Sequence, residues 1–200
     1  MTLRELRRQL RAGRRAIPDA ERRAADHAIR ASLRRLGVWQ RGHRVAAFLG
    51  MPGEVDLRPC FEPAWRRGVR LFVPRIVRRR DGAMVFVPLL AGAGLRGNVF
   101  GIAEPAHGSR GRIALRRLDT VLVPLVGFDA HGHRLGMGAG FYDRALRSRL
   151  DRSQPFRRPR LIGIAYAIQQ VDRLEPAPWD VALDLVVTER GVLRFPVRAP

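Results

Sequence analysis

Short apolar runs, separated by stretches of helical periodicity, constrain the fold of this chain more than any other feature. Each run is long enough for a buried strand and too short for a typical helix. Buried strands that alternate with helices are typical of an α/β sandwich with a mostly parallel sheet, in which ligands bind beyond the carboxyl ends of the strands. The predicted strands are Val45–Leu49, Val69–Val73, Met84–Val87, Val121–Val126, Leu161–Ala165 and, as the last one, Leu185–Thr188.

Two helices are predicted at the start of the chain. The first is indicated by apolar residues at helical spacing, Leu3, Leu6 and Leu10. Pro18 suits the first helical position of the second helix, because its fixed φ matches a helix and its missing N–H is not needed there. Gly37 is expected to end that helix, since glycine readily adopts the left-handed conformation found after many helix ends.

Further along the chain, helices are predicted over residues 57–67 and 140–150. Pro63 is expected to distort or interrupt the first of these, because proline removes a backbone donor and crowds the preceding turn. Residues 91–118 are rich in glycine and are predicted to be irregular. The sequence shows no internal repeat and no linker, so residues 1–200 are predicted to form one domain.

The charge of the chain is strongly positive. Its 200 residues carry a formal net charge of +20, and every basic side chain is arginine. Such a balance can indicate nucleic-acid binding, but the arginines are spread over the whole length. Clusters such as Arg78–Arg80 also lack the interleaved aromatic residues that stack on bases. Without lysine no Walker A loop is possible, so any ATP site must follow another design.

The apolar runs and the single cysteine bear on location. No run approaches the roughly 18 residues that a membrane span needs, so no membrane association is expected. Cys60 is the one cysteine, which excludes an intrachain disulfide and fits a reducing compartment, here predicted to be cytoplasmic. Because its surroundings are apolar, Cys60 is interpreted as a packing residue and not as a nucleophile.

The segment that follows the apolar run Val121–Phe128 contains the clearest candidate site. Arg134 offers a planar cation that suits phosphate, and Asp143 could hold Mg²⁺ through oxygen. Between them lie glycines at alternate positions, which let backbone N–H groups approach an anion without obstruction by Cβ. A strand, a glycine loop, a cation and a carboxylate together predict a nucleotide polyphosphate site. The glycines are Gly136, Gly138 and Gly140.

Several short motifs, spread nearly from end to end of the chain, match those of a known protein family. The most specific of them is the glycine loop followed by FYDR. With these motifs the chain resembles the 5-formyltetrahydrofolate cyclo-ligase family, also called methenyltetrahydrofolate synthetases. The other motifs are LRRQLRAGRR at 6–15, FLGMPGEVDLRP at 48–59, LFVPRI at 71–76, GIAEP at 101–105, LIGIAYAIQQVDRL at 161–174 and WDVALDLVVTE at 179–189.

The resemblance implies both a fold and a reaction. The fold is a three-layer α/β/α sandwich of the sugar-isomerase and CoA-transferase type. The reaction is the ATP-dependent closure of 5-formyltetrahydrofolate to 5,10-methenyltetrahydrofolate, with Mg²⁺ and with release of ADP and phosphate. Transfer of the γ-phosphoryl group to the formyl oxygen makes that oxygen a good leaving group, so the protein mainly has to position substrates and stabilise charge.

The resemblance also implies the ATP site. The basic N-terminal segment and the glycine loop contact the nucleotide in this family, and Arg134 and Tyr142 are the candidate catalytic residues. Arg7 matches the arginine of the usual Lys-x-x-Leu-Arg pattern, whereas Leu3 stands where the lysine is expected and Arg4 is its candidate replacement. The implied ATP-binding residues are Arg4, Arg7, Arg134, Leu135, Gly136, Met137, Gly138, Ala139, Gly140, Phe141 and Tyr142.

For folate recognition, the resemblance points to Phe48, Leu49, Glu54, Phe141 and Tyr142. A pterin has a guanidine-like edge, and a carboxylate such as Glu54 can accept two of its N–H groups. The aromatic and aliphatic side chains can form walls for flat rings. Neighbours on a strand face opposite ways, so one of Phe48 and Leu49 is expected to lie in the core. Glu54 could alternatively be a surface charge or a helix cap.

For the metal, the resemblance singles out Asp143 and Asp180, with Asp184 as a nearby rival. Two carboxylates together with ATP phosphates suit Mg²⁺, which keeps several of its waters. His131 and His133 could suggest zinc, but they lie in a turn and lack further ligands at suitable spacing.

Two other functions remain as alternatives. A sugar-phosphate isomerase of related fold would need a base and a sugar-phosphate pocket but no ATP site, which the glycine loop argues against. A basic nucleic-acid-binding module would show salt-dependent retention on DNA without folate turnover. The expected partners are therefore 5-formyltetrahydrofolate and ATP, with no obligatory protein partner and no membrane.

Overall fold

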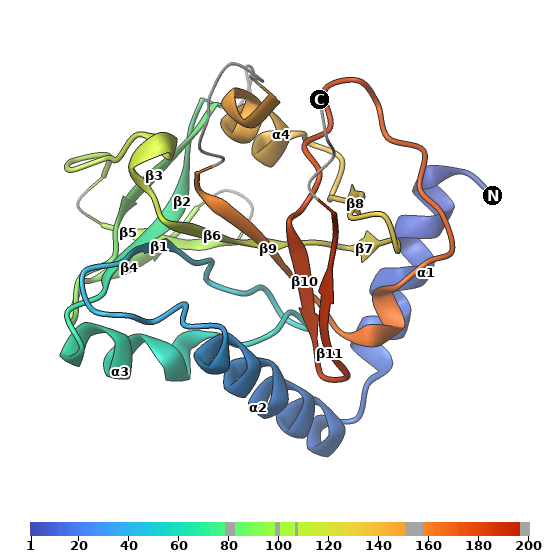
Figure 1. The fold of residues 1–200 in the computed structure, drawn as a ribbon, viewed down its shortest axis with the longest axis horizontal. Helices are drawn as coiled ribbons and strands as arrows, with labels where there is room; N and C mark the ends of the chain where they lie inside the picture. Colours follow the sequence, from blue (N-terminus) through green and yellow to red (C-terminus); the bar gives the residue numbers. More distant parts are fainter. Residues whose placement is uncertain (79–82, 99–100, 107, 151–157, 197–200) are drawn as a thin grey trace.

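The computed structural model of the protein describes residues 1–78, 83–98, 101–106, 108–150 and 158–196. Arg79 and Arg80 of the basic cluster lie outside these residues. A seven-stranded sheet forms the centre of the molecule (Figure 1). Its strands are β1 (Arg44–Ala46), β2 (Arg70–Arg78), β3 (Ala83–Pro88), β6 (Thr120–Pro124), β9 (Arg160–Ile164), β10 (Leu185–Thr188) and β11 (Gly191–Arg194).

The strands are arranged in the order β11-β10-β9-β6-β1-β2-β3. The five inner strands are parallel, and β3 and β11 pair antiparallel at the two edges. This confirms the predicted mostly parallel sheet, whose inner strands are continuous apolar runs because both of their faces are covered. The prediction that Leu185–Thr188 is the last strand was wrong. The edge strand β11 is only half-buried and therefore has no apolar run that would reveal it.

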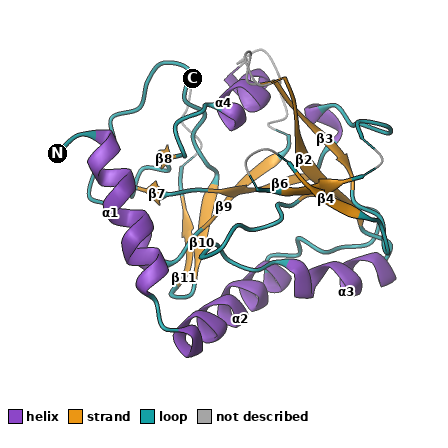
Figure 2. Ribbon diagram, turned by 180° about the vertical axis from the view of Figure 1, so that it is seen from behind, coloured by secondary structure: helices purple, strands orange, loops and turns teal. Residues whose placement is uncertain are grey.

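Helices cover both faces of the sheet, as Figures 1 and 2 show. The helices α2 (Asp19–Arg35) and α3 (Phe61–Arg66) lie along one face, and α4 (Phe141–Leu146) lies on the other. Along a strand, alternate residues enter different core clusters: Val45 packs with Ile29 of α2, whereas Ala46 packs with Leu146 of α4. This alternation is the period of two that a strand between two apolar layers requires. The predicted three-layer α/β/α arrangement is confirmed.

The helix α1 (Leu3–Ala16) lies beside the sheet. Thr2 caps it, since its hydroxyl accepts from the Glu5 N–H while the Glu5 carboxylate accepts from the Thr2 N–H. The predicted place of Pro18 was wrong by one position, because Pro18 has an extended ψ and is the N-cap of α2. Gly37 adopts φ 69° directly after the C-cap, which confirms it as the residue that ends this helix.

The predicted helix over 57–67 is divided in two. A 3₁₀ turn, Arg58–Cys60, precedes α3, and Pro63 lies in the first turn of α3, where a backbone donor is not required. The predicted helix over 140–150 consists of the six residues of α4 followed by a 3₁₀ turn, Arg147–Leu150. Both regions are therefore helical, but with shorter α-helices than predicted.

Two small hairpins were not predicted. β4 (Leu95–Gly97) pairs with β5 (Ala103–Pro105) inside the region expected to be irregular, and β7 (Gly127–Phe128) pairs with β8 (Arg134–Leu135). A 3₁₀ turn, Leu115–Arg117, also lies in that region. Strands this short carry too little periodicity to be recognised in a sequence. Within the described parts of the chain, no helix combines the length and the apolarity needed to cross a membrane.

Candidate active site

A partly open pocket of about 140 Å³ lies at the carboxyl ends of β1 and β6 and beside the middle of β2. The chain continues from β1 to β2 on one side, while β6 pairs with β1 on the other, so the pocket lies where the strand order reverses. This is the usual ligand position in such sheets. Phe48 and Leu49 line it directly after β1, and Pro124 and Leu125 line it at the end of β6.

Phe48 and Leu49 do not lie on a strand, contrary to the prediction, because β1 ends at Ala46. Both residues line the pocket, so they are not divided between pocket and core in the way that alternation on a strand would require. Phe48 is buried and also belongs to the core cluster on the α2 side, and Leu49 is half-buried against the same cluster. Together they give this end of the pocket an apolar wall.

The glycine loop lies over the N-terminal helix. Gly138 and Gly140 have φ of 101° and 65°, a left-handed backbone that side chains with Cβ rarely adopt. The Arg7 Nε donates to the Gly136 carbonyl at 2.9 Å. A Cβ built on Gly138 would lie 3.6 Å from the Arg7 guanidinium carbon. The structure thus brings together the two segments predicted to bind ATP, although 129 residues separate Arg7 from Gly136.

Arg134 is buried between the first turn of α4 and the loop that contains Asp180 and Val181. Its guanidinium donates to the Asp143 carboxylate and to the Val181 carbonyl. Burial lowers the pKa of Arg134, and the negative charges of Asp143 and Asp180 oppose that effect. Arg134 is therefore a cation held in a fixed orientation, bonded to one candidate metal ligand, Asp143, and within electrostatic reach of the other, Asp180.

The carboxylates present fit Mg²⁺ bound partly through nucleotide phosphates. Asp143 and Asp180 are oxygen donors near one buried cation, and two protein carboxylates are what Mg²⁺ commonly uses beside phosphates and water. Asp180 also accepts from the Ala177 N–H at 2.9 Å, which fixes its turn. Its rival, Asp184, instead accepts from Arg149 and from the Leu161 N–H and holds the sheet together.

The hypothesis that His131 and His133 bind zinc finds no support in the structure. His133 Nδ1 lies 2.8 Å from Asp129, and the buried Asp129 carboxylate also accepts from the backbone N–H groups of His131 and His133. Across the described residues, no group of three or more His, Cys, Asp or Glu side chains could hold a metal ion. This turn is a structural feature.

Glu54 lies in the pocket wall and is neither a surface charge nor a helix cap. Its side chain is 10% exposed and forms an ion pair with Arg14 at 3.3 Å. Its second oxygen accepts from the Met51 N–H at 3.1 Å. A carboxylate has about four acceptor positions, so two remain for a ligand.

The hydroxyl of Tyr142 is buried and has no hydrogen-bond partner among the described residues. Burial raises the pKa of Tyr142 far above its usual value, and the negative charge of Glu54 adds to this shift. The phenol therefore stays neutral and keeps its proton. A buried donor without a partner beside a pocket is the feature expected where a ligand completes the hydrogen bonding.

The remaining residues predicted to bind ATP lie in three places: the pocket, a groove along α1 and a buried cluster. Phe141, Met137 and Ala139 line the pocket, and Arg4 and Arg7 line a groove along α1 that reaches Met137. The Leu135 side chain does not reach the pocket. It is 5% exposed and packs in a cluster with Leu6, Leu10, Val126 and Leu174, so that only its backbone could meet a nucleotide.

Sequence reasoning missed one wall of the pocket, which comes from the β4–β5 hairpin and includes Asn98, Ile102 and Glu104. Glu104 is 4% exposed and accepts from Asn98 Nδ2 and from the Ile76 N–H. The motif GIAEP contains three of the pocket-lining residues, Ile102, Ala103 and Glu104, and was the available signal. Arg14 was also missed, since it looks like any other arginine of a basic helix.

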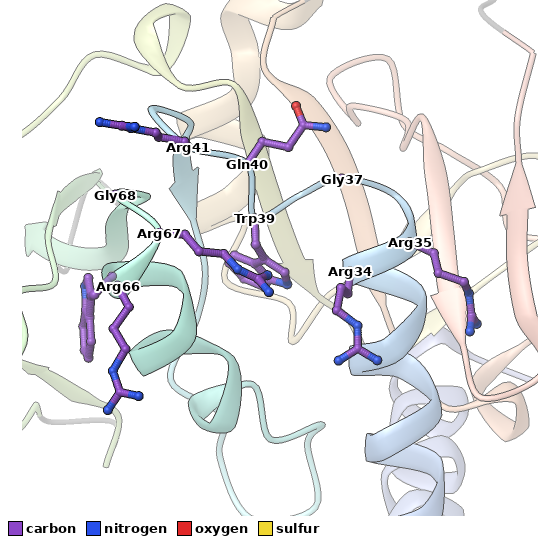
Figure 3. Close-up of a pocket in the computed structure, with 10 residues that line it drawn as sticks. Arg34, Arg35, Gly37, Trp39, Gln40, Arg41, Arg66, Arg67 and Gly68 are labelled. Carbon is purple, nitrogen blue, oxygen red and sulfur yellow. The ribbon is translucent and has the colours of Figure 1, made fainter.

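A second, wider depression lies at the opposite end of the sheet (Figure 3). It is lined by arginines at the C-terminal ends of α2 and α3, among them Arg34, Arg35 and Arg66. Cations at helix C-termini offset the partial negative charge of the last carbonyl groups. These arginines therefore have a structural explanation, and the carbonyl groups beside them do not favour an anion.

Comparison with known proteins decides the family. Residues 2–189 match the model of the 5-formyltetrahydrofolate cyclo-ligase family. The chain belongs to this family. The 5-formyltetrahydrofolate cyclo-ligase of Escherichia coli K12 is 38% identical over 151 residues, which cover 75% of this chain and 80% of that protein. The protein of the same name from Mycolicibacterium smegmatis is 30% identical over 194 residues, 94% of this chain and 95% of that one.

Solved structures agree with the family assignment. The 5,10-methenyltetrahydrofolate synthetase of Aquifex aeolicus superposes with a TM-score of 0.80 at 31% identity, covering 100% of this chain and 95% of that one. The enzyme of the same name from Mycoplasma pneumoniae gives a TM-score of 0.72 at 28% identity, covering 94% and 99%. This family member is accordingly an enzyme of the ligase class, as the motifs predicted.

Proposed function

We propose that this enzyme cyclises 5-formyltetrahydrofolate to 5,10-methenyltetrahydrofolate with ATP and Mg²⁺, releasing ADP and phosphate. The observation that carries the proposal is the adjacency of two different sites. Glu54 and Tyr142 lie in an apolar pocket, and the glycine loop, which lies over Arg7, forms one wall of that pocket. The names of the relatives support the same reaction.

The pocket is assigned to the pterin end of the folate. Its volume of about 140 Å³ is well below the roughly 300–1,000 Å³ of typical small-molecule sites, so it does not hold both substrates. Glu54 would accept two N–H groups from the pterin edge, while Phe48, Leu49 and Phe141 would contact its flat faces. Tyr142, as a neutral donor, would bind a carbonyl oxygen of the folate.

The nucleotide is assigned to the glycine loop and to the groove along α1. Arg4, Arg7, Arg8 and Arg11 line this groove, which reaches the loop at Met137. Backbone N–H groups of the loop and the Arg7 guanidinium would bind the phosphates. Mg²⁺, bound by Asp143, Asp180 and phosphate oxygens, would neutralise charge on the transferring group.

The chemistry requires positioning more than covalent participation by the protein. The γ-phosphoryl group passes to the formyl oxygen, and the bond between that phosphorus and ADP breaks. The N10 amine then attacks the activated formyl carbon, a proton leaves N10, and phosphate departs with the former formyl oxygen. Arg134, fixed between Asp143 and the Val181 carbonyl, would stabilise charge on the phosphoryl group. We place the enzyme in the cytoplasm, where Cys60 would remain a thiol.

The direct test mixes the purified protein with 5-formyltetrahydrofolate, ATP and Mg²⁺ and follows the absorbance of methenyltetrahydrofolate. We expect turnover that stops when ATP is omitted or EDTA is added. Undiminished turnover in EDTA would reject the metal requirement. Absence of product under all conditions, with the protein folded by circular dichroism, would reject the reaction itself.

A further inference from the structure

Arg14 is a buried cation in the second half of α1. The residue is 6% exposed, and its Nη1 lies 3.3 Å from Glu54 Oε1. Its Nε is buried without a hydrogen-bond partner among the described residues. Burying the Arg14 guanidinium costs free energy because the charge loses its contact with water, and the ion pair with Glu54 offsets this cost. The orientation of Arg14 and that of the Glu54 carboxylate therefore depend on each other.

The loop that carries Glu54 is anchored differently at its two ends. Asp56 is tied to α2, because its N–H donates to Asp26 and its carbonyl accepts from Arg30. Glu54 itself is bound within its own turn, through Met51, and from outside by Arg14. The contact with α1 thus holds the part of the loop that faces the pocket.

The same helix also contacts the glycine loop. Arg7, about two helical turns before Arg14, donates to the Gly136 carbonyl. Leu6 and Leu10 pack against Leu135, which fixes the rotation of α1 about its axis. One rigid element therefore holds Glu54 with one end and the nucleotide loop with the other.

We propose that Arg14 is a positioning residue that orients Glu54 toward the pocket and, through α1, couples folate binding to nucleotide binding. The proposal rests on the proposed function, because it takes Glu54 as a folate contact. A nucleotide that orders Arg7 and the glycine loop also orders α1, and with it the Arg14–Glu54 pair. By thermodynamic linkage, the folate must then strengthen nucleotide binding by the same factor.

The test measures the dissociation constant of 5-formyltetrahydrofolate with and without a non-hydrolysable ATP analogue. It compares the wild-type protein with Arg14→Met, Glu54→Gln and the double variant, each first checked by thermal unfolding. Methionine keeps much of the arginine volume and removes the charge. Arg23→Gln is the control, because Arg23 is exposed on α2 and its loss changes the net charge equally.

We expect the analogue to tighten folate binding to the wild-type protein by roughly five-fold or more, within the usual range of coupling. Arg14→Met should weaken folate binding by about tenfold and abolish the effect of the analogue. Glu54→Gln should do the same, and the double variant should be little worse than either single one, because both changes break one pair. Arg23→Gln should behave as the wild type.

Three results would overturn the proposal. One is wild-type folate affinity and coupling in Arg14→Met. Another is a wild-type effect of the ATP analogue on folate binding in Glu54→Gln. This variant breaks the same ion pair and therefore serves as the test if Arg14→Met does not fold. The third is unchanged folate affinity in Glu54→Gln, which would remove the pterin contact as well. The reaction itself is judged separately, by turnover of the wild-type protein.

Discussion

Arg134 and Asp143 form an ion pair that connects the β7–β8 hairpin to the first turn of α4. The Arg134 side chain is 4% exposed and that of Asp143 is 25% exposed, so the pair is buried on the arginine side and open on the carboxylate side. Asp143 can therefore keep its bond to Arg134 and still offer an oxygen to Mg²⁺. Removing the carboxylate to which a buried arginine is hydrogen-bonded is costly, so Asp143 has a structural role beside its proposed metal-binding role.

Asp180 gives a cleaner test of the metal site than Asp143, because asparagine can still accept from the Ala177 N–H. Asp180→Asn should raise the Mg²⁺ concentration for half-maximal turnover by about 10–100-fold, the size expected for one charged contact. Its thermal unfolding temperature should change little. A Mg²⁺ titration measures this, with Asp172→Asn on the exposed surface as the charge-matched control. An unchanged titration would remove Asp180 from the metal site.

Gly138→Val should weaken ATP binding by at least about tenfold. The left-handed φ of 101° disfavours a β-branched residue, and the new side chain would face Arg7. Folate binding without nucleotide should be less affected. Gly42→Val is the control, since Gly42 is also left-handed but has open space around it and lies far from the loop. Equal loss of ATP affinity in both variants would indicate general strain instead of a phosphate-binding role.

Tyr142→Phe separates a structural role from a ligand-binding role. Removing a buried hydroxyl without a partner should leave the free energy of unfolding unchanged or raise it by up to about 1 kcal/mol. If the hydroxyl donates to the folate, kcat/KM should fall by about tenfold, equivalent to about 1.4 kcal/mol. Unfolding and steady-state kinetics on the same preparation provide both values. Unchanged kinetics would exclude the hydroxyl from substrate binding.

Cys60 should react slowly in the native protein. Burial raises the pKa of the Cys60 thiol to about 11, so at pH 8 only about one thiol in a thousand is ionised. Alkylation by iodoacetamide should accelerate about tenfold per pH unit up to that value. The urea-unfolded protein serves as control and should react rapidly at pH 8. Rapid alkylation of the native protein at that pH would contradict the interpretation of Cys60 as a packing residue.

The sequence by itself determined the type of fold and predicted part of the candidate site, but neither Arg14 nor the pocket wall from the β4–β5 hairpin. Val121–Val126 and Leu161–Ala165 read as buried strands because both faces of the inner sheet are apolar, and the signal of their burial is local. The alternation of Gly136, Gly138 and Gly140 is likewise local, and it predicted a phosphate-binding loop; the structure adds that Gly138 and Gly140 have a left-handed backbone. The residues of the antiparallel edge strand β11 and of the β4–β5 hairpin, in contrast, carry no such local signal, because these strands are short and only partly buried.

Only the tertiary structure decided how the site residues relate to one another. Arg7 meets Gly136 across 129 positions of the chain, and Arg14 is distinguished from the other arginines of α1 only by its burial against Glu54. Leu135 belongs to the same loop motif as Arg134 and Gly136, and the sequence does not distinguish its role from theirs. In the structure its side chain packs against Leu6 and Leu10 of α1, away from the pocket. Local periodicity reports whether a residue is buried, whereas its partner depends on which distant element packs over it, and that information is in no single segment of the chain.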